Sequence, residues 1–347
     1  MDILDFDEVG RLAQQKYISV RQHKKFPLYI YNYTPRCQHD WLWTPETIAC
    51  RGLIFDANNK LVARPFKKFF TLNQYESIDV VNLYGITQEE LRAKLNGPFV
   101  VSDKLDGCLG ILYEYNGVRA IATRGSFDSP QAIIGTKILK KYDGFQFCNN
   151  ATYLFEIIYP EGNLIVDYGD KEELVLIAVI DNETGKDRDD LYKQWCDVDL
   201  PSVKIYDFGC FDDVLKCNRD NAEGFVVKLD NDMRVKVKSH EYLQISRAAQ
   251  GITKWSILEM AKSGLPDDIS KLPVRLQRDI YNTVGQLRAK YRAIDEHAKS
   301  VYKEAVKMSR EEFADIYRQY KYKAVVFQML ANKPYSEIIW KLIRREM

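Results

Sequence analysis

The sequence predicts an α+β protein of two parts, a strand-rich part at residues 1–246 and an all-α part at residues 247–347. In the first part, apolar runs are separated by turn residues such as Asn116-Gly117, a pattern typical of β-hairpins. Beyond residue 246 these runs stop, and apolar residues recur at steps of three and four, which is the period of a helix. Hairpins interleaved with a few helices predict packed antiparallel sheets in the first part.

Length and composition favour a globular protein with a sizeable core. The chain has 347 residues, of which 46% are hydrophobic and 29% charged, enough for one large or two ordinary domains. No apolar run approaches the roughly 18 to 20 residues of a membrane span, and the acidic segment MDILDFDEVGRL lacks a signal-peptide core. Seven scattered cysteines without a C-x-x-C pair predict reduced thiols. We therefore expect a cytoplasmic protein without membrane association. A monomer is also expected.

The net charge of +1 hides an asymmetry between the two parts. Residues 1–246 contain 30 lysines and arginines against 37 acidic residues, whereas residues 247–347 contain 20 against 12. A basic segment attached to an acidic one suggests an anionic polymer as a partner. Only four histidines occur, which disfavours a histidine-based hydrolase or a histidine-ligated metal centre.

Four hairpins are expected in the first part. One follows a strand that ends near Lys104, and it runs from Leu109 to Tyr115 and back from Val118 to Thr123. A helix is expected at 87–95, and a continuous apolar run at 174–180 predicts a strand buried on both faces. The other hairpins are predicted at 48–70 with a turn at 57–60, at 153–168 with a turn at 160–163, and at 224–238 around 230–232.

Helical patterns fill the second part. Apolar residues from Ile280 to Ile294 form one stripe on a helix. Ser309 and Glu312 match a capping box that opens a helix expected to continue through Phe327. Pro334 fits the first position of a final helix.

A lysine stands at the mouth of the first hairpin, in the run Lys104-Leu105-Asp106-Gly107. Because it is surrounded by strand rather than on an open helix face, Lys104 is a candidate covalent nucleophile. A K-x-D-G run alone is more often a solvated loop, so this interpretation depends on residues later in the chain.

Charged residues stand where strands should be apolar. Glu156 shares a strand face with Leu154 and Ile158, which is costly unless the carboxylate meets a cation, a metal or hydroxyl donors. Lys236 and Lys238 alternate with valines, so both lysines point to one face. Any one of these charged residues alone would be interpreted as part of a surface ion pair. Taken together with Lys104, they predict a concave face with a nucleophile, cations and carboxylates. Four more charged residues near strand ends complete the set: Arg51, Lys68, Arg124 and Glu223.

These residue types suit transfer of a phosphoryl group. Neighbouring cations and desolvation help a lysine to lose the proton that blocks its attack. Lys236 and Lys238 would neutralise a triphosphate while pyrophosphate leaves. Glu156 and Glu223 would accept hydrogen bonds from ribose hydroxyls or hold Mg²⁺. An aromatic ring such as that of Phe70 would stack on a purine.

The order of these motifs resembles that of the covalent nucleotidyltransferases, the superfamily of ligases and mRNA capping enzymes. The motifs are K-x-D-G, then F-E-I, then E-G-F-V-V-K, then K-V-K. With the upstream runs Arg51–Phe55 and Lys68–Phe70, the chain looks most like the ATP-dependent RNA ligases of the phage type, whose best-known member reseals cleaved tRNA. The resemblance covers nearly the whole chain. It implies a nucleotidyltransferase domain of ATP-grasp-like antiparallel sheets with helices, followed by an all-α domain.

The resemblance also implies roles for the residues that match its motifs. Lys104 would form the lysyl-AMP adduct, on a turn shaped by Asp106 and Gly107. Cys108 departs from the family, which usually has serine there, and Arg124 stands where lysine or arginine is expected. The remaining matches are Arg51, Lys68 and Phe70 as nucleotide contacts, Glu156 and Glu223 as ribose or metal contacts, and Lys236 and Lys238 as α-phosphate contacts.

By the same resemblance, the function is sealing of RNA with 5′-phosphate and 3′-hydroxyl ends, using ATP and Mg²⁺, with Mn²⁺ as a possible substitute. Cleaved tRNA is the expected substrate, and an end-healing kinase-phosphatase is a possible partner. Residues 247–347 would select the RNA through basic and aromatic residues such as those of Tyr317–Lys323; the alternative is a solvated helical cap. A DNA ligase or a GTP-dependent mRNA capping guanylyltransferase would share the first domain but normally carries a β-barrel after it. A non-catalytic RNA-binding relative is disfavoured because every charged catalytic position is occupied.

Overall fold

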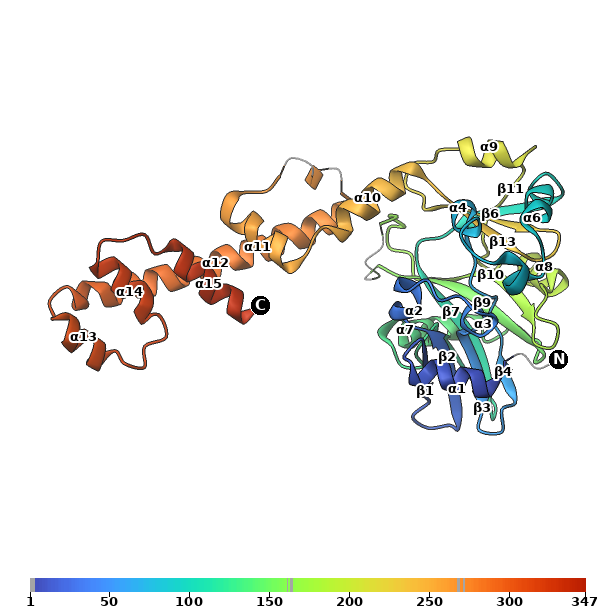
Figure 1. Ribbon diagram of the computed structural model, residues 1–347, viewed down its shortest axis with the longest axis horizontal. Helices are drawn as coiled ribbons and strands as arrows, with labels where there is room; N and C mark the ends of the chain where they lie inside the picture. Colours follow the sequence, from blue (N-terminus) through green and yellow to red (C-terminus); the bar gives the residue numbers. More distant parts are fainter. Residues whose placement is uncertain (1–3, 161, 163–164, 267–268, 271) are drawn as a thin grey trace. The chain divides into compact units, whose positions relative to one another are not determined.

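The computed structural model describes residues 4–160, 162, 165–266, 269–270 and 272–347. Contacts divide the chain into two compact units, Met1–Leu243 and Gln244–Met347. The strands belong to the first unit, and the described part of the second unit consists of helices and their connections (Figure 1). The predicted α+β class, with antiparallel sheets followed by an all-α part, is confirmed.

The described residues of the first unit form three sheets. All strand pairs are antiparallel except the short pair β13–β5. The first sheet has the order β1 (Ile18–Gln22), β2 (Leu28–Tyr33), β3 (Arg51–Asp56), β4 (Leu61–Ala63). The second has the order β10 (Glu173–Asp181), β9 (Ala151–Ile158), β7 (Cys108–Tyr115), β8 (Val118–Thr123). The third has the order β11 (Ile205–Tyr206), β6 (Phe99–Lys104), β12 (Gly224–Leu229), β13 (Arg234–Lys238), β5 (Phe70–Thr71).

Short helices cover the sheets of the first unit. The predicted helix at 87–95 is confirmed as Gln88–Leu95, with Thr87 as its N-cap. Thr87 and Glu90 form a capping box, which stabilises the start of this helix. The helices are α1 (Phe6–Gln14), α2 (Pro35–His39), α3 (Pro45–Ala49), α4 (Leu72–Tyr75), α5 (Val80–Tyr84), α6 (Gln88–Leu95), α7 (Pro130–Leu139), η1 (Lys140–Tyr142), α8 (Asp189–Asp197) and α9 (Phe211–Lys216).

The second sheet lies at the centre of this unit because both of its faces bury apolar residues. Alternate residues such as Leu154 and Ile180 pack on one face with Ile30 and Ile54 of the first sheet. The opposite face packs Phe155 and its neighbours against α7 and α8. A separate core joins the third sheet to the helices α4 to α6 and α9. This layering leaves the opposite, more polar face of β6, β12 and β13 available to form a site.

Two predicted hairpins are shorter than expected. The second strand of the 48–70 hairpin ends at Ala63, and Phe70 instead joins the third sheet, parallel to β13. Residues 165–168 of the predicted second strand of the 153–168 hairpin have an irregular conformation instead. The backbone N–H groups of Ile165 and Val166 donate to Asp106, and the Tyr168 hydroxyl accepts from the Asp106 N–H. Glu161 and Asn163 of its predicted turn lie outside the described residues. The hairpins around Asn116-Gly117 and around residues 230–232 are confirmed.

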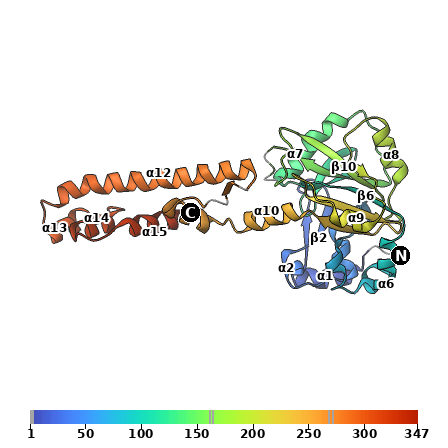
Figure 2. The same cartoon turned by 90° about the horizontal axis from the view of Figure 1, so that it is seen from above.

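The second unit packs around one long helix, α12 (Val274–Ala305). Ile280, Val284, Leu287 and Ile294 of the predicted stripe are buried in its core. Figure 2 shows α12 as a straight helix with α13 to α15 running alongside it. The other helices are α11 (Lys254–Ser263), α13 (Arg310–Ile316), α14 (Lys323–Leu330) and α15 (Ser336–Glu346), and α10 (His240–Gln250) crosses the boundary between the units.

Two helix boundaries differ from the prediction. The capping box of Ser309 and Glu312 is present, but its helix ends at Ile316, and Phe327 belongs to α14. Pro334 precedes the last helix, whose N-cap is Tyr335. Among the described residues, no helix is both long and apolar enough to cross a membrane.

Candidate active site

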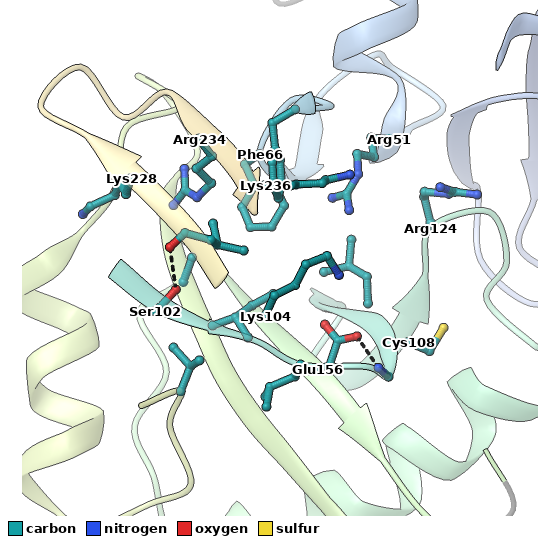
Figure 3. A pocket seen from close by; sticks show the side chains of 18 of the residues that line it. Arg51, Phe66, Ser102, Lys104, Cys108, Arg124, Glu156, Lys228, Arg234 and Lys236 are labelled. Carbon is teal, nitrogen blue, oxygen red and sulfur yellow. Dashed lines mark hydrogen bonds between the residues drawn. The ribbon is translucent and has the colours of Figure 1, made fainter. Parts of the chain in front are cut away.

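A cavity of about 740 Å³ opens in the first unit, between strands of the second and third sheets. Figure 3 shows Lys104 projecting into it, with Arg51 and Lys236 above and Glu156 below. The residues on its wall come from segments as distant in sequence as Arg51 and Lys236. Six of the predicted site residues line this cavity: Arg51, Lys104, Gly107, Arg124, Glu156 and Lys236.

Strand register brings the predicted nucleophile next to two other charged residues. Lys104 and Lys238 both pair with Gly224, on either side of β12. Lys104 Nζ lies 2.6 Å from Glu223 Oε2, and Lys238 Nζ lies 3.0 Å from Glu223 Oε1. Glu223 is only 4% exposed, so one buried carboxylate bridges two lysines. Gly224 is required here, because its φ is +135° and a Cβ would lie 2.1 Å from the carbonyl oxygen of Val237.

Glu156 supports the turn that follows Lys104. It lies on β9, and its Oε1 accepts a hydrogen bond of 3.0 Å from the backbone N–H of Gly107. A Cβ at position 107 would lie 2.7 Å from Glu156 Cγ, so glycine allows this approach. Burial raises the pKa of Glu156 to about 7, even though the charge of Lys104 acts in the opposite direction. The carboxyl group is therefore poised to change its charge near neutral pH.

Asp106 does not line the cavity, but its hydrogen bonds hold the same turn in place. Its Oδ2 accepts hydrogen bonds from the backbone N–H groups of Ile165 (2.6 Å) and Val166 (3.0 Å). Its Oδ1 accepts one from the Tyr242 hydroxyl at 3.0 Å, while its own N–H donates to the Tyr168 hydroxyl at 2.8 Å. These bonds fit the predicted role of Asp106 in shaping the turn of Lys104.

The cavity holds positive charge that no carboxylate neutralises. Lys236 forms no ion pair within the part of the chain that the structure describes, and its ammonium group lies 4.7 Å from the centre of the Phe69 ring. Burial and then the charges of Lys68 and Arg51 lower the pKa of Lys236 well below its usual value. One buried guanidinium nitrogen of Arg51 also has no hydrogen-bond partner. Such a cluster favours an anionic ligand.

Two predicted residues lie behind the cavity wall. Lys68 is buried, 3.4 Å from the Tyr33 hydroxyl, and its ammonium group faces the rings of Trp43 and Phe70. Phe70 is 1% exposed and packs against Trp41, Trp43 and Tyr75, so its ring has no face open to the cavity for a purine. The reason is that Phe70 joins a strand of the third sheet, whose core encloses it. Phe66 and Phe69 line the cavity in its place.

Some site residues were missed by the sequence analysis. The Tyr33 hydroxyl accepts a 2.7 Å hydrogen bond from Arg124, and the charges of Lys68, Arg124 and Arg51 outweigh burial and lower its pKa. Nothing in its local sequence indicates this role. Arg234 was detectable, because it precedes Lys236 and Lys238 with the same period of two and therefore shares their face.

In the described part of the chain, no metal site is built from three or more protein ligands. No group of three or more histidine, cysteine, aspartate or glutamate side chains is placed to hold an ion among the described residues. Both oxygens of Glu223 already accept lysine ammonium groups, so Glu223 does not fit a resident metal ion. Glu156 has one oxygen committed to Gly107.

Comparison with known proteins adds an independent result. A family model described as RNA ligase matches residues 49–242. A protein of Thermovibrio ammonificans, described provisionally as an RNA ligase, is 32% identical over 149 residues, which are 41% of this chain and 36% of that protein. A protein of Autographa californica nuclear polyhedrosis virus, described provisionally as a bifunctional polynucleotide kinase/RNA ligase, is 27% identical over 290 residues, 72% of this chain and 39% of that protein.

The matched stretches thus span less than two fifths of either relative. Among solved structures, a Naegleria gruberi RNA ligase with AMP and Mn aligns with 70% of this chain and 82% of its own at a TM-score of 0.42 and 16% identity. The family match covers more than half of the chain and includes Lys104, Glu156, Glu223 and Lys238. The chain belongs to the RNA ligase family.

Proposed function

We propose that this protein is an ATP-dependent ligase that joins the 5′-phosphate and 3′-hydroxyl ends of RNA through a lysyl-AMP intermediate. The observation that carries the proposal is the position of Lys104, a lysine in a cavity that also holds Lys236 and Arg51, two cations that form no ion pair with a carboxylate among the described residues. Membership of the RNA ligase family supports the same activity. The helical second unit also favours it over a DNA ligase or a capping enzyme, which by resemblance would carry a β-barrel.

In the first step, the lone pair of Lys104 Nζ attacks the α-phosphorus of ATP. The bond from this phosphorus to the bridging oxygen breaks, and pyrophosphate leaves with the electron pair. Lys104 must first pass a proton to the surrounding water and lose its contact with Glu223, since an ammonium group has no lone pair. Lys236 and Arg51 would stabilise the negative charge that develops on the leaving group. Lys238, released from sharing Glu223, would contact the α-phosphate.

Two further displacements complete the reaction. An oxygen of the RNA 5′-phosphate attacks the adenylate phosphorus, and Lys104 Nζ leaves and is protonated again. The RNA 3′-hydroxyl then attacks the 5′-phosphorus, AMP departs with the electron pair, and a phosphodiester bond remains. Each displacement depends on positioning and charge stabilisation rather than on a new covalent residue.

A divalent cation, Mg²⁺ or Mn²⁺, would enter bound to the triphosphate as part of the substrate. This interpretation follows from the absence of a protein-built metal site among the described residues. Glu156 keeps its proposed role as a ribose or metal contact, whereas Glu223 would serve as a contact only after Lys104 has left it.

The proposal extends to the RNA substrate, a partner enzyme, the oligomeric state and the compartment. Cleaved tRNA fits a basic second unit, and an end-healing kinase-phosphatase partner is suggested by the viral relative, whose name couples a polynucleotide kinase to an RNA ligase. A monomer would suffice, because the cavity is built within one chain. The seven free cysteines favour a reducing compartment such as the cytoplasm.

The test is incubation with α-labelled ATP or GTP and Mg²⁺, followed by a denaturing gel. We expect a labelled protein band with ATP, and transfer of the label to a 5′-phosphorylated RNA added afterwards. Lys104→Arg should abolish the band because guanidinium stays protonated, whereas the exposed control Lys60→Arg should retain it. Labelling of Lys104→Arg at the rate of the control would refute the assignment.

A further inference from the structure

The cavity continues beyond Lys104 toward a second charged cluster. Strand register arranges the inner face of the third sheet in rows. Lys104 and Lys238 flank Gly224, while Val100 and Arg234 flank Lys228. The two rows are four residues apart, which corresponds to roughly 13 Å along the strands. Figure 3 shows Lys228 and Arg234 on one side of Lys104, and Arg124 on the other.

Asp187 closes this far end of the cavity. Its Oδ2 lies 2.6 Å from an Arg234 nitrogen and 3.2 Å from Lys228 Nζ. The side chains of Asp187 and Arg234 are each only 8% exposed. Asp187 Oδ1, in contrast, is buried and has no hydrogen-bond partner among the described residues. A buried carboxylate oxygen without a donor costs free energy, so it is a natural acceptor for a group supplied by a ligand.

The backbone holds Asp187 firmly in this place. Asp187 forms a β-bridge with Ile180 at the end of β10, and the N–H of the next residue, Arg188, donates to the Val179 carbonyl at 2.8 Å. The Arg64 guanidinium fixes the preceding turn through the carbonyls of residues 182 (3.1 Å) and 183 (2.7 Å). A side chain anchored in this way is suited to discriminate between ligands.

The charge balance at this end suits a neutral polar group rather than a phosphate. Lys228 and Arg234 are both paired with Asp187, and Lys228 also contacts Asp189 at 2.8 Å. This distinguishes them from Lys236 and Arg51, which have no such partners. Between the two ends, the wall carries apolar side chains suited to a flat ring, among them Val100, Ile177, Ile205 and Val226.

We propose that Asp187 Oδ1 accepts a hydrogen bond from the 6-amino group of the adenine base, and so selects ATP over nucleotides with a 6-oxo group. The proposal rests on the proposed function, because it assumes that the α-phosphate lies at Lys104. Adenine presents one exocyclic donor flanked by ring-nitrogen acceptors. The cluster presents one unpartnered acceptor, Asp187 Oδ1, while Lys228 and Arg234 both pair with the other carboxylate oxygen, Oδ2. The exocyclic donor of adenine is complementary to this unpartnered acceptor.

A 6-oxo purine reverses this pattern. Its oxygen would face Asp187 Oδ1, acceptor against acceptor, and would leave the carboxylate oxygen unpaired in a buried position. Sites built to hydrogen-bond one polar group discriminate strongly against an analogue that leaves that bond unmade. Removing the 6-amino group alone should therefore weaken adduct formation, and replacing it by oxygen should weaken it further.

The experiment measures the rate of protein–nucleotide adduct formation by the full-length chain with three substrates: ATP, purine riboside triphosphate and ITP. We expect the wild type to prefer ATP to each analogue by at least about tenfold. In Asp187→Asn, Arg234 and Lys228 should retain the amide oxygen, which turns a donating –NH₂ toward the base. The preference for ATP over ITP should then fall by about tenfold or more.

Asp190→Asn is the matched control, since Asp190 pairs with Arg188 in the same segment but does not line the cavity. It should keep the wild-type preference. Equal rates with ATP and purine riboside triphosphate in the wild type, or an unchanged preference in a folded Asp187→Asn, would overturn the inference. If Asp187→Asn does not fold, the wild-type comparison decides alone. Absence of any adduct with all three nucleotides would instead refute the proposed function.

Discussion

Lys104 and Lys238 share the carboxylate of Glu223, whose two oxygens lie 2.6 Å and 3.0 Å from the two ammonium nitrogens. Breaking a buried pair by removing one partner leaves an uncompensated charge, which typically costs about 3 to 5 kcal/mol. Glu223→Gln would leave two lysines facing each other. We therefore expect a large loss of unfolding free energy at pH 7, measured by urea denaturation.

The chain offers a matched control for this prediction. Glu172 also approaches two lysines, Lys137 at 3.5 Å and Lys141 at 3.8 Å, but on the surface. Exposed ion pairs contribute about 0 to 1 kcal/mol. Glu172→Gln should therefore be nearly neutral, and a Glu223→Gln protein as stable as Glu172→Gln would show that the buried bridge contributes little.

We expect Lys236 to lower the unfolding free energy of the protein but to be needed for adduct formation. Its pKa is lowered by burial and by neighbouring cations, so the folded state binds fewer protons than the unfolded state up to about pH 10.5, the usual lysine value. The stability of the wild type should therefore rise with pH across this window. Lys236→Met should be more stable than the wild type at pH 7, and the difference should shrink toward pH 10. Adduct formation should fall by at least about a hundredfold.

Thermal melts between pH 6 and 10 measure this difference, with the exposed Lys60→Met as the control. A Lys236→Met protein that melts below the wild type at pH 7 would contradict the interpretation. It would mean that a counter-charge compensates the buried ammonium group.

Glu156 should make the stability of the protein depend on pH in the opposite direction to Lys236. Burial raises its pKa to about 7 from an ordinary value near 4.5, so the folded state binds more protons than the unfolded state between these limits. The wild type should lose stability as pH rises from about 4.5 to 7, by up to about 3 kcal/mol. Glu156→Gln cannot titrate, so its unfolding free energy should not fall over this pH window. In urea titrations the variant should therefore become more stable than the wild type, relative to their difference at low pH, as pH rises through the window. Parallel stability curves for the two proteins would contradict the prediction.

Cys108 should tolerate serine, the residue usual in the family at this position. The thiol lines the cavity, and burial raises its pKa to about 11, so at neutral pH it is an uncharged group of small volume. Serine preserves both properties. Cys108→Ser should form the adduct within about twofold of the wild-type rate, because the change is nearly isosteric. A loss above tenfold would show that the sulfur has a specific role.

The sequence predicted those parts of the site that follow from local periodicity. Alternation in β13 placed Lys236 and Lys238 on one face, and the same rule extends to Arg234. The K-x-D-G run predicted a sharp turn. Glu156 in a buried strand predicted a cation, a metal or hydroxyl donors as its partner, whereas the structure shows a hydrogen bond from the backbone N–H of Gly107. These features depend on a few adjacent residues, so they are visible without a structure.

Residues assembled by tertiary packing were not predictable in this way. Tyr33 meets Lys68 and Arg124 only because the first sheet packs on the second, and no local pattern marks it. Phe70 and Phe66 are both aromatic residues of one segment, and the strand pairing of Phe70 with β13 decides which of them is enclosed. The unpaired oxygen of Asp187 likewise depends on which cations the fold brings to it.

The second unit should contribute to the choice of RNA, because it is basic and its segment Tyr317–Lys323 combines exposed cations with aromatic rings. Arg318, Lys321 and Lys323 are exposed, while Tyr320 packs with Tyr322 and His297. Phosphate contacts add salt-dependent affinity, and aromatic rings stack on unpaired bases. Replacing the three cations by alanine should weaken sealing of a nicked tRNA loop more than sealing of a plain oligonucleotide, and should reduce the salt dependence.

Truncation near residue 246 extends this test. It removes nearly all of the second unit but retains Tyr242, whose hydroxyl donates a hydrogen bond to Asp106 in the turn after Lys104. Adduct formation with ATP should therefore persist if the first unit folds alone, which a thermal melt checks. Sealing of both substrates is then measured across a salt series with the full-length and truncated chains. A selective loss on the tRNA loop, with a shallower salt slope, is expected because phosphate contacts are lost. Equal losses on both substrates with an unchanged slope would leave these helices only a structural role.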